Sequence, residues 1–356
     1  MKDRNQLKAD AVQLLMELIP IQSYSREEWG TASHLTKFLF DRDVVVNRVG
    51  NNVIALNKHY DAAKPTLLLN SHHDTVKPNK AYTRDPFKAE IIDGRLYGLG
   101  STDAGGALVS IISAFLHFYD SENLPYNLAL AAVAEEEISG SGGIELALKH
   151  LPKPDCALVG EPTLMDLAIA ERGLLVLDAI AQGKAGHAAR NEGENAIYKA
   201  LQDIQWLSTY SFPLASDFLG PVKLTVTSIE TENRTHNIVP SECRFIVDVR
   251  LNECYTHEEV IEVIKNHVQS VIHPRSDRLR SSLIPVEHPL VQAGMAMGKT
   301  CYGSPTSSDK ALMPCPALKM GPGDSARSHT ADEYIFVREI EEGIDTYIDL
   351  LNRFLK

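Results

Sequence analysis

The segment Thr66–Asp74 reads TLLLNSHHD, and it gives the first clear indication of the fold. Its apolar start, TLLLN, is short and uninterrupted, which is typical of a strand buried on both faces of a parallel sheet. Two side chains that can bind ligands, His72 and Asp74, follow at the carboxyl end of this strand. Ligands bind open parallel sheets outside the carboxyl ends of the strands. We therefore expect this strand to deliver His72 and Asp74 to a functional site.

Similar segments surround this strand in the sequence. Apolar periodicity and a Ser25–Glu28 capping box predict helices, and short apolar runs predict further buried strands. The helices are expected at 5–18, 25–40, 105–118 and 142–150, and the strands at 44–46, 53–56, 128–134 and 157–159. This alternation of strands and helices predicts a doubly wound α/β domain.

The pattern changes near Gly173. Strands are expected at 174–181, 223–229 and 244–251, with helices at 194–208 and, after a Thr256–Glu259 capping box, at 256–271. This β-α-β-β-α order, to which one closing strand could be added, fits a ferredoxin-like α+β module. The stretch His273–Ser281 is interpreted as a return linker.

After this linker the α/β pattern resumes. A helix is expected after Pro289, a strand at 317–320 and an amphipathic helix at 337–354. The buried stripe of that last helix is predicted to be Val337, Ile340, Ile344, Ile348, Leu351 and Leu355. The sequence therefore predicts one discontinuous α/β domain, residues 1–172 and 281–356, with a smaller domain inserted at 173–280.

Composition excludes several classes of protein. The chain has 356 residues, of which 44% are hydrophobic and 23% charged, as in globular proteins. Its 47 acidic and 35 basic residues give a net charge of −12, which argues against binding of nucleic acid or of anionic membranes. No apolar run is long enough to span a membrane, and the charged N-terminus does not resemble a secretory signal. The five cysteines form no CxxC pair and are interpreted as small buried residues, so a reducing, cytoplasmic location is expected.

Histidines and carboxylates follow four predicted strands where each strand ends. Two imidazoles and several carboxylates without a thiolate suit zinc, cobalt or manganese. Two divalent ions that share one carboxylate would neutralise such a cluster at a separation of roughly 3.5–4 Å, and a glutamate outside the ligand set could then act as a general base. The residues concerned are His72, Asp74, Glu135, Glu136, Glu137, Glu161, Asp324 and His329, joined by Asp103 after Gly98–Gly100.

Each of these residues taken alone has a simpler interpretation. The run Glu135–Glu137 is most often a solvated charged segment. A single histidine such as His72 is more often a hydrogen-bonded structural residue, and Asp103 could be a helix N-cap. Their joint placement at one edge of the sheet is what favours a metal site.

From about Leu67 to Tyr334 these motifs resemble the M20 family of zinc aminoacylases and peptidases in order and spacing. Such a resemblance implies a doubly wound zinc-peptidase domain that binds two divalent ions, most often zinc, with cobalt as an alternative. It makes Glu136 the general base and gives Asp74 the role of orienting His72. The implied ligands are His72, Asp103 and Glu161 for one ion, and Asp103, Glu137 and His329 for the other.

The inserted segment resembles the family's dimerisation, or lid, domain. Gly183–His187 reads GKAGH, like the family's G-x-x-G-H segment, whose histidine reaches the partner subunit's site and hydrogen-bonds the developing oxyanion. The resemblance thus implies a homodimer. It also makes Asn237 and Arg250 candidates for substrate binding, and an arginine is well suited to a carboxylate. Without the resemblance, His187 and Arg250 would be interpreted as surface residues.

The sequence departs from the family pattern at three positions. Ser71 replaces a glycine, Gly105 occupies a position where lysine is frequent, and Glu135 replaces an aspartate that is common before the E-E pair. The loss of the lysine removes a positive charge and puts close substrate analogies in doubt.

The resemblance implies hydrolysis of the amide bond of an N-acyl amino acid. Glu137–Gly142 and Gly160–Thr163 look most like acetylornithine deacetylase, which acts in arginine biosynthesis. The acyl group, acetyl or succinyl, and the amino acid, ornithine or citrulline, stay open. Alternatives are a succinyl-diaminopimelate desuccinylase, a dipeptidase of the same family, or a non-catalytic member that only binds a ligand.

Overall fold

The computed structural model describes residues 3–190 and 192–356. The chain forms two compact units. Unit 1 consists of the residues up to Ile169 together with Ile284–Tyr302 and Ser308–Lys356, and unit 2 consists of Ala170–Leu283 and Gly303–Ser307. Unit 1 is therefore discontinuous in sequence.

Unit 1 is built on a mixed sheet whose strands run in the order β1-β2-β6-β3-β7-β19-β8. The central neighbours β6, β3, β7 and β19 pair in parallel, whereas β1, β2 and β8 join antiparallel. The strands are β1 (Val46–Val49), β2 (Asn52–Leu56), β3 (Thr66–His72), β6 (Asn127–Val133), β7 (Cys156–Val159), β8 (Leu167–Glu171) and β19 (Ala317–Lys319). The predicted central strands are confirmed, but β8 was not anticipated as a strand of this sheet.

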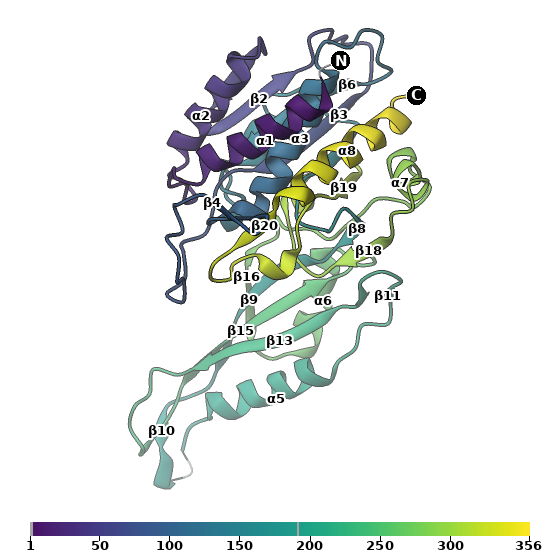
Figure 1. The fold of residues 1–356 in the computed structure, drawn as a ribbon. Helices are drawn as coiled ribbons and strands as arrows, with labels where there is room; N and C mark the ends of the chain where they lie inside the picture. The colour runs from purple at the N-terminus through teal and green to yellow at the C-terminus, as the bar shows by residue number, and fades with distance from the viewer. Residues whose placement is uncertain (1–2, 191) are drawn as a thin grey trace. The chain divides into compact units, whose positions relative to one another are not determined.

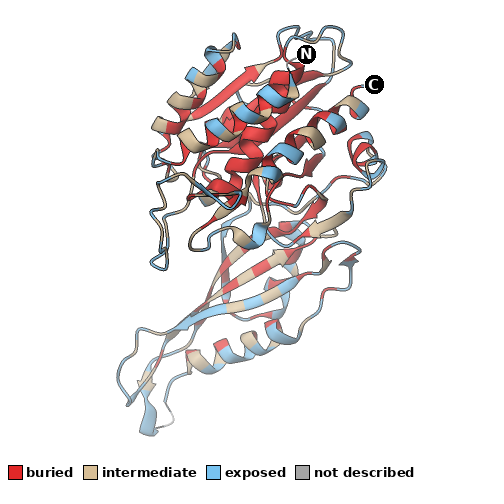
Figure 2. Cartoon of the chain, in the orientation of Figure 1, coloured by how far each residue is buried: buried red, intermediate tan, exposed pale blue. Residues whose placement is uncertain are grey.

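Helices cover both faces of the sheet in unit 1. Along β6, Leu128 and Leu130 belong to one apolar cluster and Ala129 and Ala131 to another, because successive side chains of a strand point to opposite faces. Three helices lie side by side over the first face (Figure 1): α1 (Arg4–Leu18), α3 (Ala107–Phe118) and α8 (Val337–Phe354). Helix α2 (Trp29–Phe40) packs into the same apolar cluster. Helix α4 (Ile144–Leu148) covers the other face. Figure 2 shows the resulting buried central strands. The doubly wound prediction is confirmed.

The last helix of the chain follows its predicted pattern closely. Helix α8 begins at Val337 and ends at Phe354, as expected. Every residue of the predicted stripe is buried except Val337, which is half-buried at the start of the helix.

A small antiparallel sheet that the sequence did not predict joins distant segments of unit 1. Strands β4 (Glu90–Ile92), β5 (Arg95–Tyr97) and β20 (Tyr334–Phe336) are each three residues long and antiparallel. The pairing of β20 with β5 places the residues before Tyr334 beside the loop that follows Tyr97. Segments more than 200 residues apart in sequence thus meet at this point.

The beginning of α2 differs from the prediction. The helix starts at Trp29, its N-cap is Glu28, and no side chain caps it, so the predicted Ser25–Glu28 capping box is wrong. The Ser25 hydroxyl instead donates to Asp74 Oδ2 at 2.7 Å. The buried Glu28 carboxylate accepts the Arg26 and Glu135 N–H groups and the Asn51 amide. Ser25 and Glu28 therefore form hydrogen bonds to residues around His72 and do not cap the helix.

Unit 2 contains a four-stranded antiparallel sheet in the order β13-β15-β9-β16, with two helices. In sequence order its elements are β9 (Gly173–Gln182), α5 (Ala196–Thr209), β13 (Lys223–Glu230), β15 (Glu242–Leu251), α6 (His257–His267) and β16 (Val271–Ser276). Burial alternates along β9 and β15, so one face packs on the helices and the other does not. The β-α-β-β-α-β order confirms the ferredoxin-like α+β prediction.

The last helix and the last strand of the unit 2 sheet differ from the prediction. The Thr256–Glu259 capping box is present, but α6 ends at His267 rather than near residue 271. The start of the expected linker is strand β16, which contains Pro274. Proline is tolerated there because β16 is an edge strand, where one row of N–H groups has no strand partner.

The burial of the five cysteines agrees only in part with the prediction. Cys156 and Cys243 are buried as expected, whereas Cys254, Cys301 and Cys315 are only partly buried, which corrects that interpretation for these three. All five thiols are free of disulfides. Among the described residues, no helix combines the length and apolar character needed to cross a membrane.

Helix α7 (Pro289–Met295) has a titratable side chain at its N-cap. Its N-cap is His288, whose Nδ1 accepts the Leu290 N–H at 3.2 Å, and burial lowers the pKa of His288 below its usual value. A lowered pKa in the folded state means that protons bind preferentially to the unfolded chain. We therefore expect the capping contribution to be present above about pH 6.5 and to be lost as the pH falls below that value.

We expect His288→Asn to remove this pH dependence, because asparagine caps helices without titrating. Wild type and variant should have similar free energies of unfolding near pH 7.5, and the variant should be more stable by about 1 kcal/mol near pH 5. Urea unfolding at both pH values measures this. Equal pH dependence in the two proteins would contradict the role of the His288 imidazole.

Candidate metal centre

The carboxyl ends of the parallel strands in unit 1 bring the predicted ligands together. His72 is the last residue of β3, Glu136 and Glu137 follow β6, and Glu161 follows β7. Asp103 lies in the irregular turn Ser101–Gly106 that leads into α3. The expectation that strand ends meet at one edge is therefore met by these residues.

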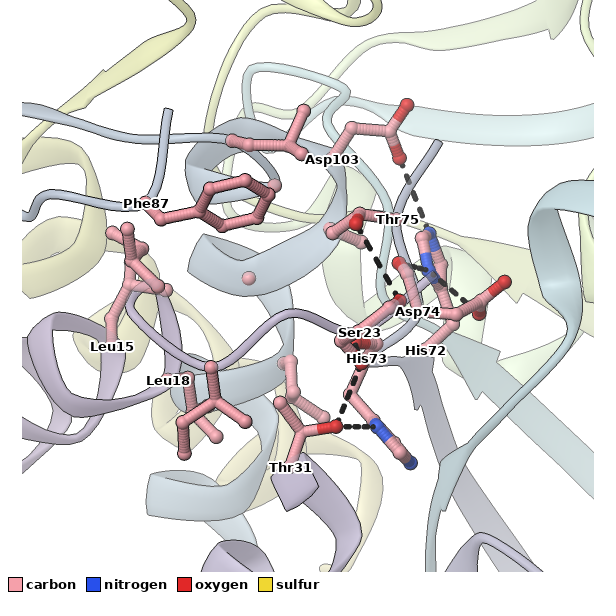
Figure 3. A pocket seen from close by; sticks show the side chains of 17 residues that line it. Leu15, Leu18, Ser23, Thr31, His72, His73, Asp74, Thr75, Phe87 and Asp103 are labelled. Carbon is pink, nitrogen blue, oxygen red and sulfur yellow. Dashed lines mark hydrogen bonds and ion pairs between the residues drawn. The ribbon is translucent and has the colours of Figure 1, made fainter. Parts of the chain in front are cut away.

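Two imidazoles face opposite oxygens of one carboxylate. His72 Nε2 lies 3.2 Å from Asp103 Oδ1, and His329 Nε2 lies 3.5 Å from Asp103 Oδ2. His72 Nε2 is also 3.6 Å from Glu161 Oε1 and 3.9 Å from Glu136 Oε2, while His329 Nε2 is 2.9 Å from Glu137 Oε2. Figure 3 shows Asp103 and His72 directed at each other. Asp103 thus lies between two groups of potential ligands.

The hydrogen bonding of His72 favours ligation through Nε2. Its Nδ1 lies 3.0 Å from the Asp74 main-chain oxygen and 3.4 Å from Asp74 Oδ1. A proton on Nδ1 donates to Asp74, so the neutral ring presents the Nε2 lone pair to the carboxylates. The predicted orienting role of Asp74 is compatible with these distances.

Asp74 also holds the main chain of the E-E pair. Its carboxylate accepts the N–H groups of Glu136 at 3.0 Å and Glu137 at 3.2 Å, besides the Ser25 hydroxyl. One buried side chain therefore orients His72 and both glutamates. Ser25 was missed because its sequence context resembles a helix cap.

Electrostatics at the cluster reflect an excess of acidic groups. Burial raises the pKa of Glu136 well above its usual range, with further increases from Glu161, Asp309 and Glu137 and a decrease from His72. Burial alone would lower the pKa of His72, but its bonds to Asp103 and Asp74 and the nearby glutamates raise it well above its usual value. The bond to Glu137 raises the pKa of His329 to about 9. Glu136 and the two imidazoles thus hold their protons more readily than they usually do.

The donor set fits divalent cations. Ligand atoms of His72, Asp103 and Glu137 lie within 4.8 Å of one another, as do those of His72, Glu136 and Glu161. Imidazole and carboxylate ligands without thiolates suit zinc and similar ions. An adjoining pocket is lined by His72, Asp74 and Asp103 and by apolar residues such as Leu15, Leu18 and Phe87 (Figure 3). The apolar wall lowers the local dielectric and strengthens attraction between the cluster and a cation.

The departures from the family pattern have local explanations. A Cβ on Gly105 would lie 2.4 Å from the Gly100 oxygen and 2.6 Å from Leu15 Cδ1, so this backbone leaves no room for a side chain. Ser71 is buried and donates to the Gly160 oxygen at 2.9 Å, which ties the end of β3 to the end of β7. Glu135 accepts the Gly142 N–H at 3.3 Å.

Three further polar residues near the cluster were not anticipated. Glu333 is buried and accepts main-chain N–H groups next to Asp103, and burial raises the pKa of its carboxyl to about 8. Asp309 is buried, accepts the Asn70 amide at 2.9 Å and raises the pKa of Glu136. His73 is buried between Thr31 and the Asn51 oxygen, and burial lowers its pKa to about 4, which keeps the ring neutral. No local motif distinguishes these residues in the sequence.

The structure brings together two of the three candidates in the insert. His187 lies in the ribbon of β10 (Gly186–His187) and β14 (Ile238–Val239), and the Ala188 N–H donates to the Asn237 oxygen at 3.0 Å. His187 and Asn237 are both exposed. The Ala189 N–H donates to His187 Nδ1 at 3.2 Å, so the neutral ring carries its proton on Nε2.

Arg250 lies elsewhere in unit 2. It pairs with Leu174 in the sheet, whereas Glu242, at the other end of β15, pairs with Gln182 near the ribbon. Glu242 and Arg250 are eight positions apart along the strand, which corresponds to roughly 26 Å. The Arg250 guanidinium is paired with Asp248 at 2.8 Å. Within unit 2, therefore, Arg250 does not join His187 and Asn237.

Comparisons with known proteins agree with this fold. Residues 68–353 match the sequence profile of peptidase family M20/M25/M40. The chain is 26% identical over 380 residues to succinyl-diaminopimelate desuccinylase 2 of a Ruegeria species, covering 95% of this chain and 93% of that protein. It is 29% identical over 295 residues to the acetylornithine deacetylase of Proteus mirabilis, covering 77% and 75%. The crystal structure of aminopeptidase PepT from Bacillus cereus aligns with a TM-score of 0.76 at 19% identity, covering 98% of this chain and 99% of that one.

The fold and the cluster define an α/β protein with candidate metal ligands at its strand ends. Since the family profile spans most of the sequence, the chain belongs to peptidase family M20/M25/M40. The expectation drawn from the motifs is thereby confirmed at the level of the family and its fold.

Proposed function

We propose that the chain hydrolyses the amide bond of an N-acyl amino acid with the help of two divalent ions. The observation that carries this proposal is the position of Asp103, whose two oxygens each face a different imidazole. The proposed ligands are His72, Asp103 and Glu161 for one ion, and Asp103, Glu137 and His329 for the other. Zinc fits this set best, and cobalt is the alternative.

Bound in this way, the two ions would polarise the amide carbonyl and acidify the attacking water. Glu136 is assigned the role of general base because the family pattern leaves it outside both ligand sets. Its carboxylate lies 3.9 Å from His72 Nε2, close enough to reach a water held at the centre, and it also belongs to a candidate ligand group with His72 and Glu161. It accepts the proton of the attacking water and later gives it to the leaving amine. Asp74 supports this role, because it fixes the Glu136 main chain and the His72 ring.

We assign stabilisation of the oxyanion to His187 of a partner subunit. The exposed position of His187 and the proton on its Nε2 suit a donor that acts on another chain's substrate. Unit 2 would then serve as the dimerisation and lid domain of a homodimer. Asn237, beside His187, would bind the substrate, whereas Arg250 would have to exchange Asp248 for a substrate carboxylate.

The substrate assigned first is N-acetylornithine, or a close N-acetyl or N-succinyl derivative of ornithine or citrulline, in arginine biosynthesis. The segments Glu137–Gly142 and Gly160–Thr163 and the likeness to an acetylornithine deacetylase support it. Succinyl-diaminopimelate is the second candidate, because several relatives are named as desuccinylases of that compound. N-acetylornithine and succinyl-diaminopimelate share an N-acyl group on a diamino acid. A small-molecule enzyme of the cytoplasm, without nucleic-acid or membrane partners, fits the acidic composition.

Amine release from a panel of acyl amino acids tests this proposal. The panel holds the N-acetyl and N-succinyl forms of ornithine and citrulline, succinyl-diaminopimelate and a few dipeptides, each with zinc-loaded and metal-free protein. Turnover of one acyl amino acid only by the zinc-loaded protein would support the proposal. Turnover of dipeptides alone would assign a peptidase instead, and absence of both metal binding and turnover would favour a non-catalytic member.

A further inference from the structure

A buried carboxylate collects three main-chain N–H groups beside the proposed metal centre. Glu333 is 2% exposed. Its Oε2 accepts the Gly100 N–H at 3.0 Å, and its Oε1 accepts the N–H groups of Thr102 at 2.8 Å and Asp103 at 3.0 Å. Successive N–H groups that converge on one carboxyl form a concave site that favours its ionised form. These bonds act against burial, which raises the pKa of the Glu333 carboxyl to about 8.

The main chain around Glu333 holds the same loop from the other side. The Gly98 N–H donates to the Glu333 oxygen at 3.0 Å, and the Thr102 hydroxyl donates to the Tyr334 oxygen at 2.6 Å. Strand pairing between Tyr334 and Tyr97 continues this junction. The loop Gly98–Asp103 is therefore bonded to the segment of Glu333 at Gly98, Gly100, Thr102 and Asp103.

This segment also carries the second imidazole. His329 lies four residues before Glu333, and its Nε2 is 3.5 Å from Asp103 Oδ2. Asp332, the residue before Glu333, accepts the N–H groups of Thr83 and Arg84 and so anchors the segment to another loop. Glu333 thus links the main chain at Asp103 to the segment that carries His329.

We propose that Glu333 is a positioning residue that holds the Asp103 carboxylate between the two metal positions and so sets the affinity of the second ion. This inference rests on the proposed function, since it takes Asp103 as the shared ligand. Glu333 belongs to neither proposed ligand set. Its effect passes through three N–H bonds to the main chain of the Asp103 loop.

Glu333→Gln tests the proposal with almost no change in shape. The amide has one accepting oxygen, and its NH₂ group would face N–H donors, so at least one bond to Gly100, Thr102 or Asp103 is lost. We expect the dissociation constant of the more weakly held zinc ion to rise by about 10–100-fold, as for other residues that orient metal ligands. Competition with a chromophoric chelator, without substrate, measures both dissociation constants. At subsaturating zinc, kcat should fall while KM changes little.

Asp203→Asn is the matched control. Asp203 is also a buried carboxylate, in unit 2, and it accepts the N–H groups of Gln269 and Ser270 and the Ser270 hydroxyl. Its substitution removes the same kind of bond and should lower thermal stability without changing either zinc affinity. A purely structural role of Glu333 would give the same result as this control.

The outcomes separate the two levels of the proposal. Wild-type protein that binds fewer than two zinc ions would overturn both the proposed function and this inference. Two ions bound equally well by wild type and Glu333→Gln would overturn the inference alone. Should Glu333→Gln not fold, Glu333→Asp keeps the charge with one methylene less, and zinc affinities equal to wild type in that variant would overturn the inference in the same way.

Discussion

Glu136→Gln should retain both metal ions and lose about 10²–10⁴-fold in kcat, which is the usual contribution of a positioned general base. The amide keeps the size of the side chain but cannot accept a proton from the attacking water. The bond from Glu136 to the Asp74 carboxylate uses the main-chain N–H of Glu136, so it does not depend on the Glu136 side chain and the local fold should persist. Measurement of zinc content and of kcat on the preferred acyl amino acid tests this expectation.

The neighbouring Glu135→Gln provides the control for loss of one charge. Glu135 directs its carboxylate to the Gly142 N–H, away from the proposed ligand sets. This variant should keep most of the wild-type kcat. Full metal occupancy together with a wild-type rate in Glu136→Gln would refute the assignment of Glu136 as the base.

The strongly patterned parts of the fold could be predicted from the sequence. The run TLLLN is buried along its whole length in β3, and the stripe of α8 was recognisable because eighteen helical residues repeat one pattern. The strands β4, β5 and β20 have three residues each, which is too short for periodicity to identify. Short strands of this kind form because distant segments pair, and local sequence does not record that pairing.

The same distinction applies to the site. Residues that meet at strand ends, such as His72 and Glu161, were predictable because the fold dictates their position. Ser25 bonds to Asp74 across 49 positions and Glu333 to Thr102 across 231, so their roles depend on tertiary contacts. Ser25 was misassigned to a helix cap for this reason. The residues that hold the ligands were therefore harder to predict than the ligands themselves.

His187→Ala should lower kcat by roughly 10²–10³-fold, the usual cost of removing one donor to an oxyanion. Zinc content should not change, since His187 belongs to neither proposed ligand set. The alanine variant keeps the β10–β14 pairing, because that ribbon is held by main-chain contacts. A loss of activity alone, however, would not reveal which subunit supplies the histidine.

Mixing two inactive variants answers that question. In a dimer of one Glu136→Gln and one His187→Ala subunit, the metal centre of the second subunit retains Glu136 and receives His187 of the first. Because random exchange gives half mixed dimers with one intact site each, about a quarter of wild-type activity should return. Recovery requires subunit exchange, so the mixture is unfolded and refolded together, and each variant refolded alone serves as the control. If His187 acted within its own chain, every site would lack one residue and the mixture would stay as inactive as its components.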